Sequence, residues 1–215
     1  MQDRDIAIVV AGGQSRRMKP LGDKLLLPRG PGDVPILLHV VQRALQVADD
    51  VYVAYANEML RRTLHDLGLT NARWIRDRLP TAGPLQAIAG VLREIGQTSF
   101  STFFLIAGDL PGITHDVLRR LKKELLQLDK DVDGVVVVRA GRIQPLLACY
   151  RPSAIRAIDE AYLAGETRLM AAIQRMNIQP MEWAPDEALS WVVRPVHTPD
   201  DYQEWLVWRD GFETS

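Results

Sequence analysis

The sequence feature that most constrains the fold is the apolar run from Ile6 to Ala11, which ends in Gly12 and Gly13. The run is continuous and mostly β-branched, which is typical of a strand buried on both faces of a parallel sheet. Such a strand requires helices on both sides, so the run predicts an α/β protein. The two glycines predict a tight bend, free of side chains, where the strand ends.

The residues after this bend predict an anion-binding loop. Ser15, Arg16 and Arg17 follow directly, and Lys24 lies slightly further on. Glycines let the backbone approach an anion and present N–H groups to it, while arginine and lysine supply compensating charge. We interpret the stretch as a cradle for a polyphosphate, although an ordinary turn with a solvated basic loop stays open. Neither the P-loop nor the dinucleotide-binding fingerprint is present, which disfavours P-loop ATPases and NAD enzymes.

These residues also resemble a known family. Residues 11–18 read Ala-Gly-Gly-x-Ser-x-Arg-Met and residues 22–27 read Gly-Asp-Lys-x-Leu-Leu. This is similar to the signature of nucleotidyltransferases that move a nucleotide from an NTP onto a phosphorylated acceptor. Within that superfamily the chain most resembles the molybdenum cofactor guanylyltransferase (MobA-like) family, which attaches GMP to molybdopterin in bacteria. The resemblance extends from Ile6 to Trp205 through three motif blocks in the same order.

Composition excludes several other classes. The formal net charge of −1 shows no overall excess of basic residues, which disfavours extended nucleic-acid binding, and the positive charge of interest is local. The single cysteine, Cys149, has no partner for an internal disulfide or a thiolate metal site. The chain has no signal-peptide core and no apolar run long enough to span a bilayer. We therefore expect a cytoplasmic protein with no nucleic-acid or membrane partner.

Apolar runs alternate with amphipathic stretches along the whole chain, which predicts a mostly parallel sheet with helices on both faces. This is a three-layer α/β/α sandwich of the Rossmann-like type, and the resemblance implies the nucleotide-diphospho-sugar transferase variety. Without repeats or long linkers, residues 1–215 are expected to form one nucleotidyltransferase domain. Further strands are expected at 51–56, 72–76, 101–107, 132–138 and about 191–193. Helices are expected at 35–48, 58–67, 85–95, after 114, at 152–164, at 167–175 with Thr167 as its cap, and after 198.

Polar residues follow two of the expected strands. Asn57 comes after the second strand and Asp77 directly after the third, and ligands in open α/β sheets gather at the carboxyl ends of strands. Locally, Asn57 could equally be a helix cap and Asp77 a turn former. The family carries an Asp and a Gly-Pro-Leu here, which Asp77 and residues 83–85 match. The resemblance implies that these residues, including Gly83, frame the purine and ribose.

Asp109 is the strongest single candidate for a functional residue. It lies at the tip of the apolar strand 101–107 and is followed by Pro111, so it is aimed at the same edge of the sheet as the glycine loop. Mg²⁺ binds carboxylate and phosphate oxygens together, which suits such a residue. The alternative is a simple turn before Pro111. The family carries Asp-x-Pro here as its magnesium motif, which implies that Asp109 is the metal ligand.

The second half of the chain holds a further motif block, Gln-Pro-Leu-x-Ala-x-Tyr, at residues 144–150. Gln144 and Pro145 interrupt an otherwise regular strand that follows a hairpin turn at 140–142, as a bulge or a substrate-facing kink would. The resemblance implies that both contribute to acceptor binding. Cys149, among alternating apolar residues, is expected to be a buried filler rather than a nucleophile.

Residues 197–201 read His-Thr-Pro-Asp-Asp, which predicts a capped start of the last helix. The family usually has asparagine where this chain has His197, and that asparagine lies near the metal in related transferases. The substitution leaves a second protein ligand for magnesium open, and a histidine at a helix start with no metal role is an equal alternative.

The candidate residues suit in-line nucleotidyl transfer, in which both partners are anionic and the protein supplies charge neutralisation and alignment. Lys24, Asp109 and Arg17 are the candidate catalytic residues, and Asp109 is the candidate ligand of Mg²⁺. The candidate nucleotide-binding residues are Val10, Ala11, Gly12, Gly13, Ser15, Arg16, Lys24, Asn57, Asp77, Gly83 and Asp109. The resemblance implies GTP and molybdopterin as substrates, and transient contact with proteins that donate or accept the cofactor.

Three alternatives remain at this point. Ala-Gly-Gly with Gly-Asp-Lys resembles the guanylyl branch, but residues 18–22 depart from the usual pattern beside the phosphates. A cytidylyltransferase for the same cofactor, or a transferase for another small phosphorylated acceptor, is therefore kept open. A non-catalytic module that binds a nucleotide or delivers a cofactor is less favoured, because binding alone rarely needs both Lys24 and Asp109.

Overall fold

The computed structural model describes residues 4–12, 18, 21–77, 83–96, 99–183 and 187–213. In these residues seven strands form one sheet in the order β3-β2-β1-β4-β6-β5-β7. The strands are β1 (Asp5–Ala11), β2 (Asp50–Tyr55), β3 (Arg73–Arg76), β4 (Thr102–Ala107), β5 (Gly134–Arg139), β6 (Arg142–Tyr150) and β7 (Ile178–Glu182). β6 runs antiparallel to both its neighbours, and the other pairings are parallel. The mixed, mostly parallel sheet agrees with the sequence prediction.

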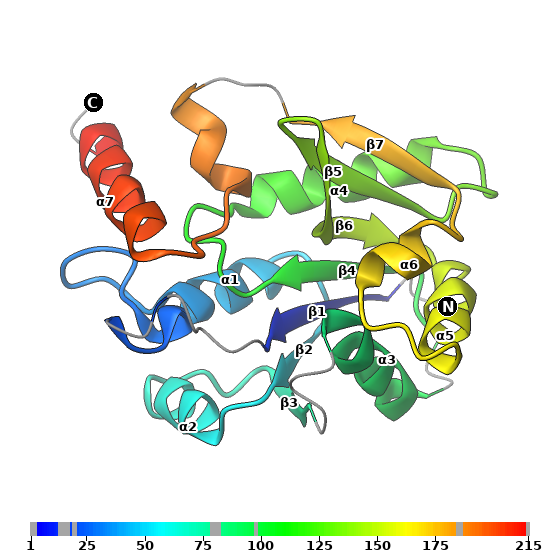
Figure 1. The fold of residues 1–215 in the computed structure, drawn as a ribbon, viewed down its shortest axis with the longest axis horizontal. Helices are drawn as coiled ribbons and strands as arrows, with labels where there is room; N and C mark the ends of the chain where they lie inside the picture. Colours follow the sequence, from blue (N-terminus) through cyan, green and yellow to red (C-terminus); the bar gives the residue numbers. More distant parts are fainter. Residues whose placement is uncertain are drawn as a thin grey trace.

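Helices cover both faces of the sheet, as the continuous apolar strands require (Figure 1). On one face lie α1 (Ile36–Ala44), α2 (Glu58–Asp66), α4 (His115–Gln127) and α7 (Pro199–Glu213), together with a 3₁₀ helix, η3 (Glu187–Val193). The opposite face carries α3 (Pro84–Ile95), α5 (Ala154–Leu163) and α6 (Leu169–Ile173). None of the helices in the described residues is long and apolar enough to cross a membrane.

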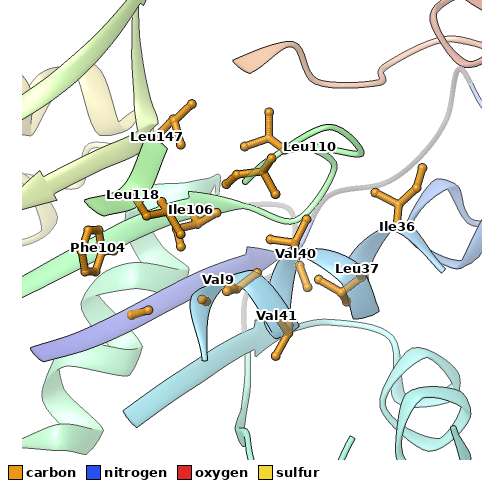
Figure 2. Close-up of a cluster of buried hydrophobic side chains, with 14 of the residues drawn as sticks. Val9, Ile36, Leu37, Val40, Val41, Phe104, Ile106, Leu110, Leu118 and Leu147 are labelled. Atoms are coloured by element: carbon orange, nitrogen blue, oxygen red, sulfur yellow. The ribbon is translucent and has the colours of Figure 1, made fainter. Parts of the chain in front are cut away.

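β1 shows how the sequence produces these layers. Ala7, Val9 and Ala11 point into one apolar cluster, and the residues between them point into the other, because successive strand side chains alternate between faces. Figure 2 shows Val40 and Val41 of α1 packed beside Val9. Each such side chain, buried completely, contributes roughly 1.5–3 kcal/mol to folding. The strand is therefore held from both sides, and its carboxyl end is fixed.

The expected caps are largely confirmed. Thr114 accepts a hydrogen bond from the amide of Val117 at the start of α4. At the start of α7, Thr198 and Asp201 exchange hydrogen bonds, with Thr198 Oγ1 accepting from the Asp201 amide at 3.1 Å. The expected cap at Thr167 is wrong, because α6 begins at Leu169. The carbonyl of Thr167 instead packs against the start of α3, where a Cβ on Gly83 would lie 2.4 Å from it.

The strand expected at 191–193 is also wrong. These residues belong to η3, because all three are buried against the core and Trp191 packs edge-on against Trp205 of α7, with ring centroids 5.6 Å apart. A strand that was not expected, β7, follows α6 and pairs with β5 at the edge of the sheet. Its polar residues and Pro180 hide the usual strand pattern, and an edge position tolerates that proline.

Candidate active site

A cavity of about 320 Å³ opens at the carboxyl ends of the central strands. Its lining comes from the ends of β1 and β4, from the residue after β3, from the start of α3, from the irregular part of β6 and from the segment after η3. In open α/β sheets this edge is the usual place for ligands, because the strand order reverses there.

Lys24 and Asp109 lie side by side in this cavity. Asp23 accepts a hydrogen bond from the amide of Leu25 at 3.1 Å and so starts the short 3₁₀ helix η2 (Lys24–Leu26) that presents the lysine. The ammonium of Lys24 forms an ion pair with Oδ2 of Asp109 and lies 3.4 Å from the carbonyl oxygen of Val196. The two side chains are 17% and 11% exposed, so the pair is largely shielded from water while remaining open to the cavity.

Asp109 is ionised despite its burial. Burial alone would raise the pKa of the carboxyl, but the hydrogen bond from His197 and the charge of Lys24 outweigh it, and the pKa lies below its ordinary value. Nδ1 of His197 is 3.3 Å from Oδ2 of Asp109. The cavity thus contains one stable carboxylate with two nitrogen groups directed at it.

The residues expected around the nucleoside fall into different places. Asp77 and Gly83 line the cavity, as do Val10 and Gly12, and a Cβ on Gly12 would lie 3.8 Å from the Asp77 carboxylate. Gly83 has φ +89°, a conformation that glycine adopts without strain, and it precedes the first turn of α3. The backbone amide of Asp77 is held by the carbonyl of Tyr55 at 2.7 Å. These contacts fix the floor of the cavity between β1 and α3.

Asn57 and Ala11 lie outside the lining of the cavity. Asn57 caps α2 by accepting a hydrogen bond from the amide of Met59 at 3.0 Å, which is the helix-cap alternative from the sequence. Its side-chain amide also donates to Asp23 at 3.3 Å, next to Lys24. Ala11 is buried in the core below. Both residues therefore lie next to the cavity without lining it, Asn57 through its contact with Asp23 and Ala11 as part of the core.

The irregularity expected at Gln144 and Pro145 is a bulge. Val136 pairs with Ala148 and the next residue pairs with Gln144, so three residues of β6 are left without a register partner on β5. Gln144, Pro145 and the two leucines after them line the cavity. The buried hydroxyl of Tyr150 donates to the Pro145 carbonyl at 3.1 Å and holds the bulge in place.

Cys149, on the same strand, is fully buried, and burial raises the pKa of its thiol to about 12, which agrees with the expected filler role. Four candidates for the phosphate-binding loop, Gly13, Ser15, Arg16 and Arg17, lie outside the described residues.

Sequence reasoning missed part of the cavity wall. Val193 and Pro195 line it, and the amide of Val196 donates to the carbonyl of Asp109 at 2.9 Å. Because residues 191–193 were predicted to form a strand, this part of the cavity wall was not expected. The unusual His197 was the sequence feature that came closest to indicating it.

The donor set fits a hard cation that is held mainly by its substrate. Among the described residues no group of three or more His, Cys, Asp or Glu side chains could hold a metal ion. Asp109 provides one ionised, shielded carboxylate at the cavity. Mg²⁺ commonly binds through one or two carboxylates together with substrate phosphates and water. The site therefore suits a metal that arrives with a polyphosphate better than a resident metal.

Comparison with known sequences identifies the family of the chain and the class of reaction. The sequence profile described as the MobA-like NTP transferase domain matches residues 7–180, which is most of the chain. The chain belongs to the MobA-like NTP transferase family. It is a nucleotidyltransferase, as the motifs at 11–18 and 22–27 indicate. A protein of Mycobacterium tuberculosis H37Rv named probable molybdenum cofactor guanylyltransferase is 31% identical over 166 residues, 77% of each chain.

Solved structures share the MobA-like fold. Molybdopterin-guanine dinucleotide biosynthesis protein A from Archaeoglobus fulgidus is 21% identical, with a TM-score of 0.72 over 96% of this chain and 99% of that one. A CMP:2-keto-3-deoxy-manno-octonic acid synthetase in complex with CTP is 16% identical, with a TM-score of 0.72 over 99% and 100%. Rv0371c of M. tuberculosis H37Rv in complex with manganese is 15% identical, with a TM-score of 0.67 over 95% and 98%. At these identities the likeness concerns the fold.

Proposed function

We propose that this MobA-like nucleotidyltransferase transfers GMP from GTP to molybdopterin and releases pyrophosphate. The observation that carries the proposal is the Lys24–Asp109 pair in the cavity, in a chain 31% identical to a probable molybdenum cofactor guanylyltransferase. A cation and a carboxylate in contact at the edge of a parallel sheet match what a triphosphate with a divalent cation needs. In this proposal the whole chain acts as one domain, which the presence of the segment after η3 in the lining of the cavity supports.

In the proposed reaction a phosphate oxygen of molybdopterin attacks the α-phosphorus of GTP in line with the leaving group. A new P–O bond forms as the bond to the pyrophosphate oxygen breaks, so the reaction needs no protein nucleophile. The protein's task is to bring two anions together and to stabilise the charge on the transferred phosphoryl group. Divalent magnesium would neutralise phosphate charge and orient the phosphates.

Each residue has a role in this proposal. On binding of GTP, Lys24 would leave its ion pair with Asp109 and contact the phosphates, and Asp109 would be the residue that holds the cation. Arg17 joins Lys24 at the triphosphate, together with Gly12, Gly13, Ser15 and Arg16. Val10, Asp77 and Gly83 frame the nucleoside, and Ala11 and Asn57 support this part of the site from outside the cavity. Gln144 and Pro145, on the bulge of β6, bind the acceptor.

The test is pyrophosphate release measured with each of the four NTPs, with and without molybdopterin, in the presence and absence of Mg²⁺. We expect release with GTP only when both molybdopterin and Mg²⁺ are present. A preference for CTP would indicate cytidylyl transfer instead of guanylyl transfer. Pyrophosphate release with another phosphorylated compound in place of molybdopterin would indicate a different acceptor. Absence of Mg²⁺-dependent release with every NTP would contradict the proposed reaction and favour a binding module.

A further inference from the structure

The hairpin that joins β5 and β6 carries two arginines directly opposite each other. Arg139 and Arg142 are a register pair at the end of the two strands, and the loop between them is only Ala140 and Gly141. Both loop residues have positive φ, +49° and +68°, as a two-residue turn that matches the twist of the strands requires. Glycine adopts this conformation freely, whereas Ala140 is strained. The tight turn therefore holds the two arginine backbones together.

This pair is unfavourable unless something compensates its charge. Side chains directly opposite on antiparallel strands have Cβ atoms about 5 Å apart, and like charges in that arrangement are destabilising. Neither guanidinium forms an ion pair with a carboxylate of the described residues. Nε of Arg139 is buried and has no hydrogen-bond partner in the described part of the chain. Two uncompensated cations and an unsatisfied donor together suit an anion.

The pair lies on the acceptor side of the cavity. Strand side chains alternate between faces, and Val137 points toward the layer of η3 and α7, so Arg139 lies on that face too. Gln144 is opposite Val137 and Arg142 is opposite Arg139, which places all of them on one face. Gln144 lines the cavity, and Arg142 lies about 7 Å further along the strand. The side-chain amide of Gln144 donates to the Arg142 carbonyl at 3.2 Å, which joins the hairpin to the cavity wall.

We propose that Arg139 and Arg142 bind an anionic group of the acceptor at the end remote from the phosphate that reacts. The inference rests on the proposed function, because that function places the acceptor against Gln144 and Pro145. The reacting phosphate has to reach the nucleotide beside Lys24, so the far end of the acceptor extends toward the hairpin. In molybdopterin that end carries two neighbouring dithiolene sulfurs, which are thiolates when they hold the metal. A guanidinium presents its donors in a planar fork, which suits two anionic atoms side by side.

The competing explanation is that both arginines are solvated and have no ligand. It predicts that their replacement leaves the KM of both substrates unchanged. A third arrangement, in which the pair binds the phosphates of the nucleotide, predicts a change in the KM of GTP instead. Separate measurement of the two KM values therefore distinguishes the three.

The experiment measures KM for molybdopterin and for GTP in pyrophosphate release by the wild type, Arg139→Gln, Arg142→Gln and Arg142→Lys. We expect KM for molybdopterin to rise about tenfold in each glutamine variant, with little change in kcat or in KM for GTP. Arg142→Lys keeps the charge without the planar fork, so its KM should lie between those of the wild type and Arg142→Gln. Arg156→Gln is the matched control, because Arg156 is an exposed arginine of α5 that does not line the cavity.

Thermal unfolding of the same preparations separates binding from a structural role. Removing one of two opposed like charges should leave Tm unchanged or raise it by about 1–3 °C, whereas a residue that stabilises the hairpin would lower Tm when replaced. A higher KM for molybdopterin together with an undiminished Tm is therefore the expected combination.

Titration of molybdopterin into the intact chain, followed by tryptophan fluorescence, measures acceptor binding without turnover. We expect Kd to rise with salt in the wild type and to rise less steeply in the glutamine variants. Unchanged KM and Kd for molybdopterin in both glutamine variants, with turnover intact, would overturn the inference and leave the proposed function standing. A rise in KM for GTP alone would also overturn it, because it would assign the pair to the nucleotide. Absence of molybdopterin binding to the wild type would overturn both the inference and the proposed function.

Discussion

The substitution Asp109→Asn tests the site most directly, because it removes one negative charge and keeps the shape of the side chain. The side chain of Asp109 is 11% exposed, and its Oδ2 atom is in contact with both Lys24 and His197. Losing a metal ligand or an electrostatic partner of the transition state costs on the order of 3–5 kcal/mol. At about 1.4 kcal/mol per factor of ten, kcat/KM for GTP should fall by roughly 10² to 10⁴.

The fold should survive this change. The amide oxygen can still accept a hydrogen bond from Lys24, which also reaches the Val196 carbonyl, so the ammonium keeps polar partners. Replacing one charged hydrogen bond with a neutral one lowers the free energy of unfolding by about 1–2 kcal/mol. In a chain of this size that corresponds to a fall in Tm of about 2–8 °C.

The assay is Mg²⁺-dependent pyrophosphate release with GTP and molybdopterin, alongside thermal unfolding of the same preparations. Asp66→Asn is the matched control, since Asp66 is an exposed carboxylate at the end of α2. We expect Asp66→Asn to behave as the wild type in both measurements. If Asp109→Asn kept kcat/KM within tenfold of the wild type while remaining folded, Asp109 would have no part in the reaction.

Three further predictions concern His39, Tyr150 and Gly83. Burial, reinforced by a nearby arginine, lowers the pKa of His39 from 6.5 to about 4, so folding excludes a proton that the unfolded chain binds between these pH values. The free energy of unfolding should therefore fall by about 2 kcal/mol more between pH 7.5 and 5 in the wild type than in His39→Gln, measured by urea denaturation. Tyr150→Phe removes the hydrogen bond to the Pro145 carbonyl and should raise KM for molybdopterin about fivefold with little change in kcat. An unchanged KM would show that the bulge of β6 has no part in acceptor binding. Gly83→Ala should lower the free energy of unfolding by at least about 1–2 kcal/mol and reduce pyrophosphate release, because φ is +89° and the new Cβ would meet a backbone carbonyl at 2.4 Å. Gly96→Ala, with φ +64° and no atom within 4 Å, should show only the stability loss.

Much of the fold could be predicted because its signals are local. The runs that form β1 and β4 are apolar on both faces, as expected for strands of a sheet that is covered on both sides, and both end where the sequence changes to glycine or aspartate. The position of Asp109 at a strand tip follows from the same pattern. The break at Gln144 and Pro145 likewise marked the bulge, because proline cannot donate to a regular ladder.

The elements that were missed depend on contacts distant in sequence. Residues 191–193 have the apolar, β-branched composition of a strand, but the packing of Trp191 on Trp205 favours a 3₁₀ helix there. β7 forms because the edge of β5 offers free backbone groups, although residues 178–182 carry little strand pattern of their own. Local propensity is a weak guide where tertiary contacts provide most of the stabilisation.

The same contacts show why the cavity depends on the end of the chain. The hydroxyl of Tyr202 in α7 donates to the carbonyl of Pro28 at 2.7 Å, and the indole of Trp205 donates to the carbonyl of Arg29 at 2.6 Å. The guanidinium of Arg29 in turn donates to the carbonyl of Pro111 at 2.8 Å, just after Asp109.

Helix α7 therefore fastens the segment that follows Lys24 to the loop that carries Asp109, two parts of the chain that are 85 residues apart. The match to the MobA-like domain ends at residue 180, before this helix begins. The motifs thus specify which groups meet at the site, whereas their alignment depends on a C-terminal segment beyond the matched domain. Changes in that segment are therefore expected to alter the alignment of the site while the motifs themselves stay the same.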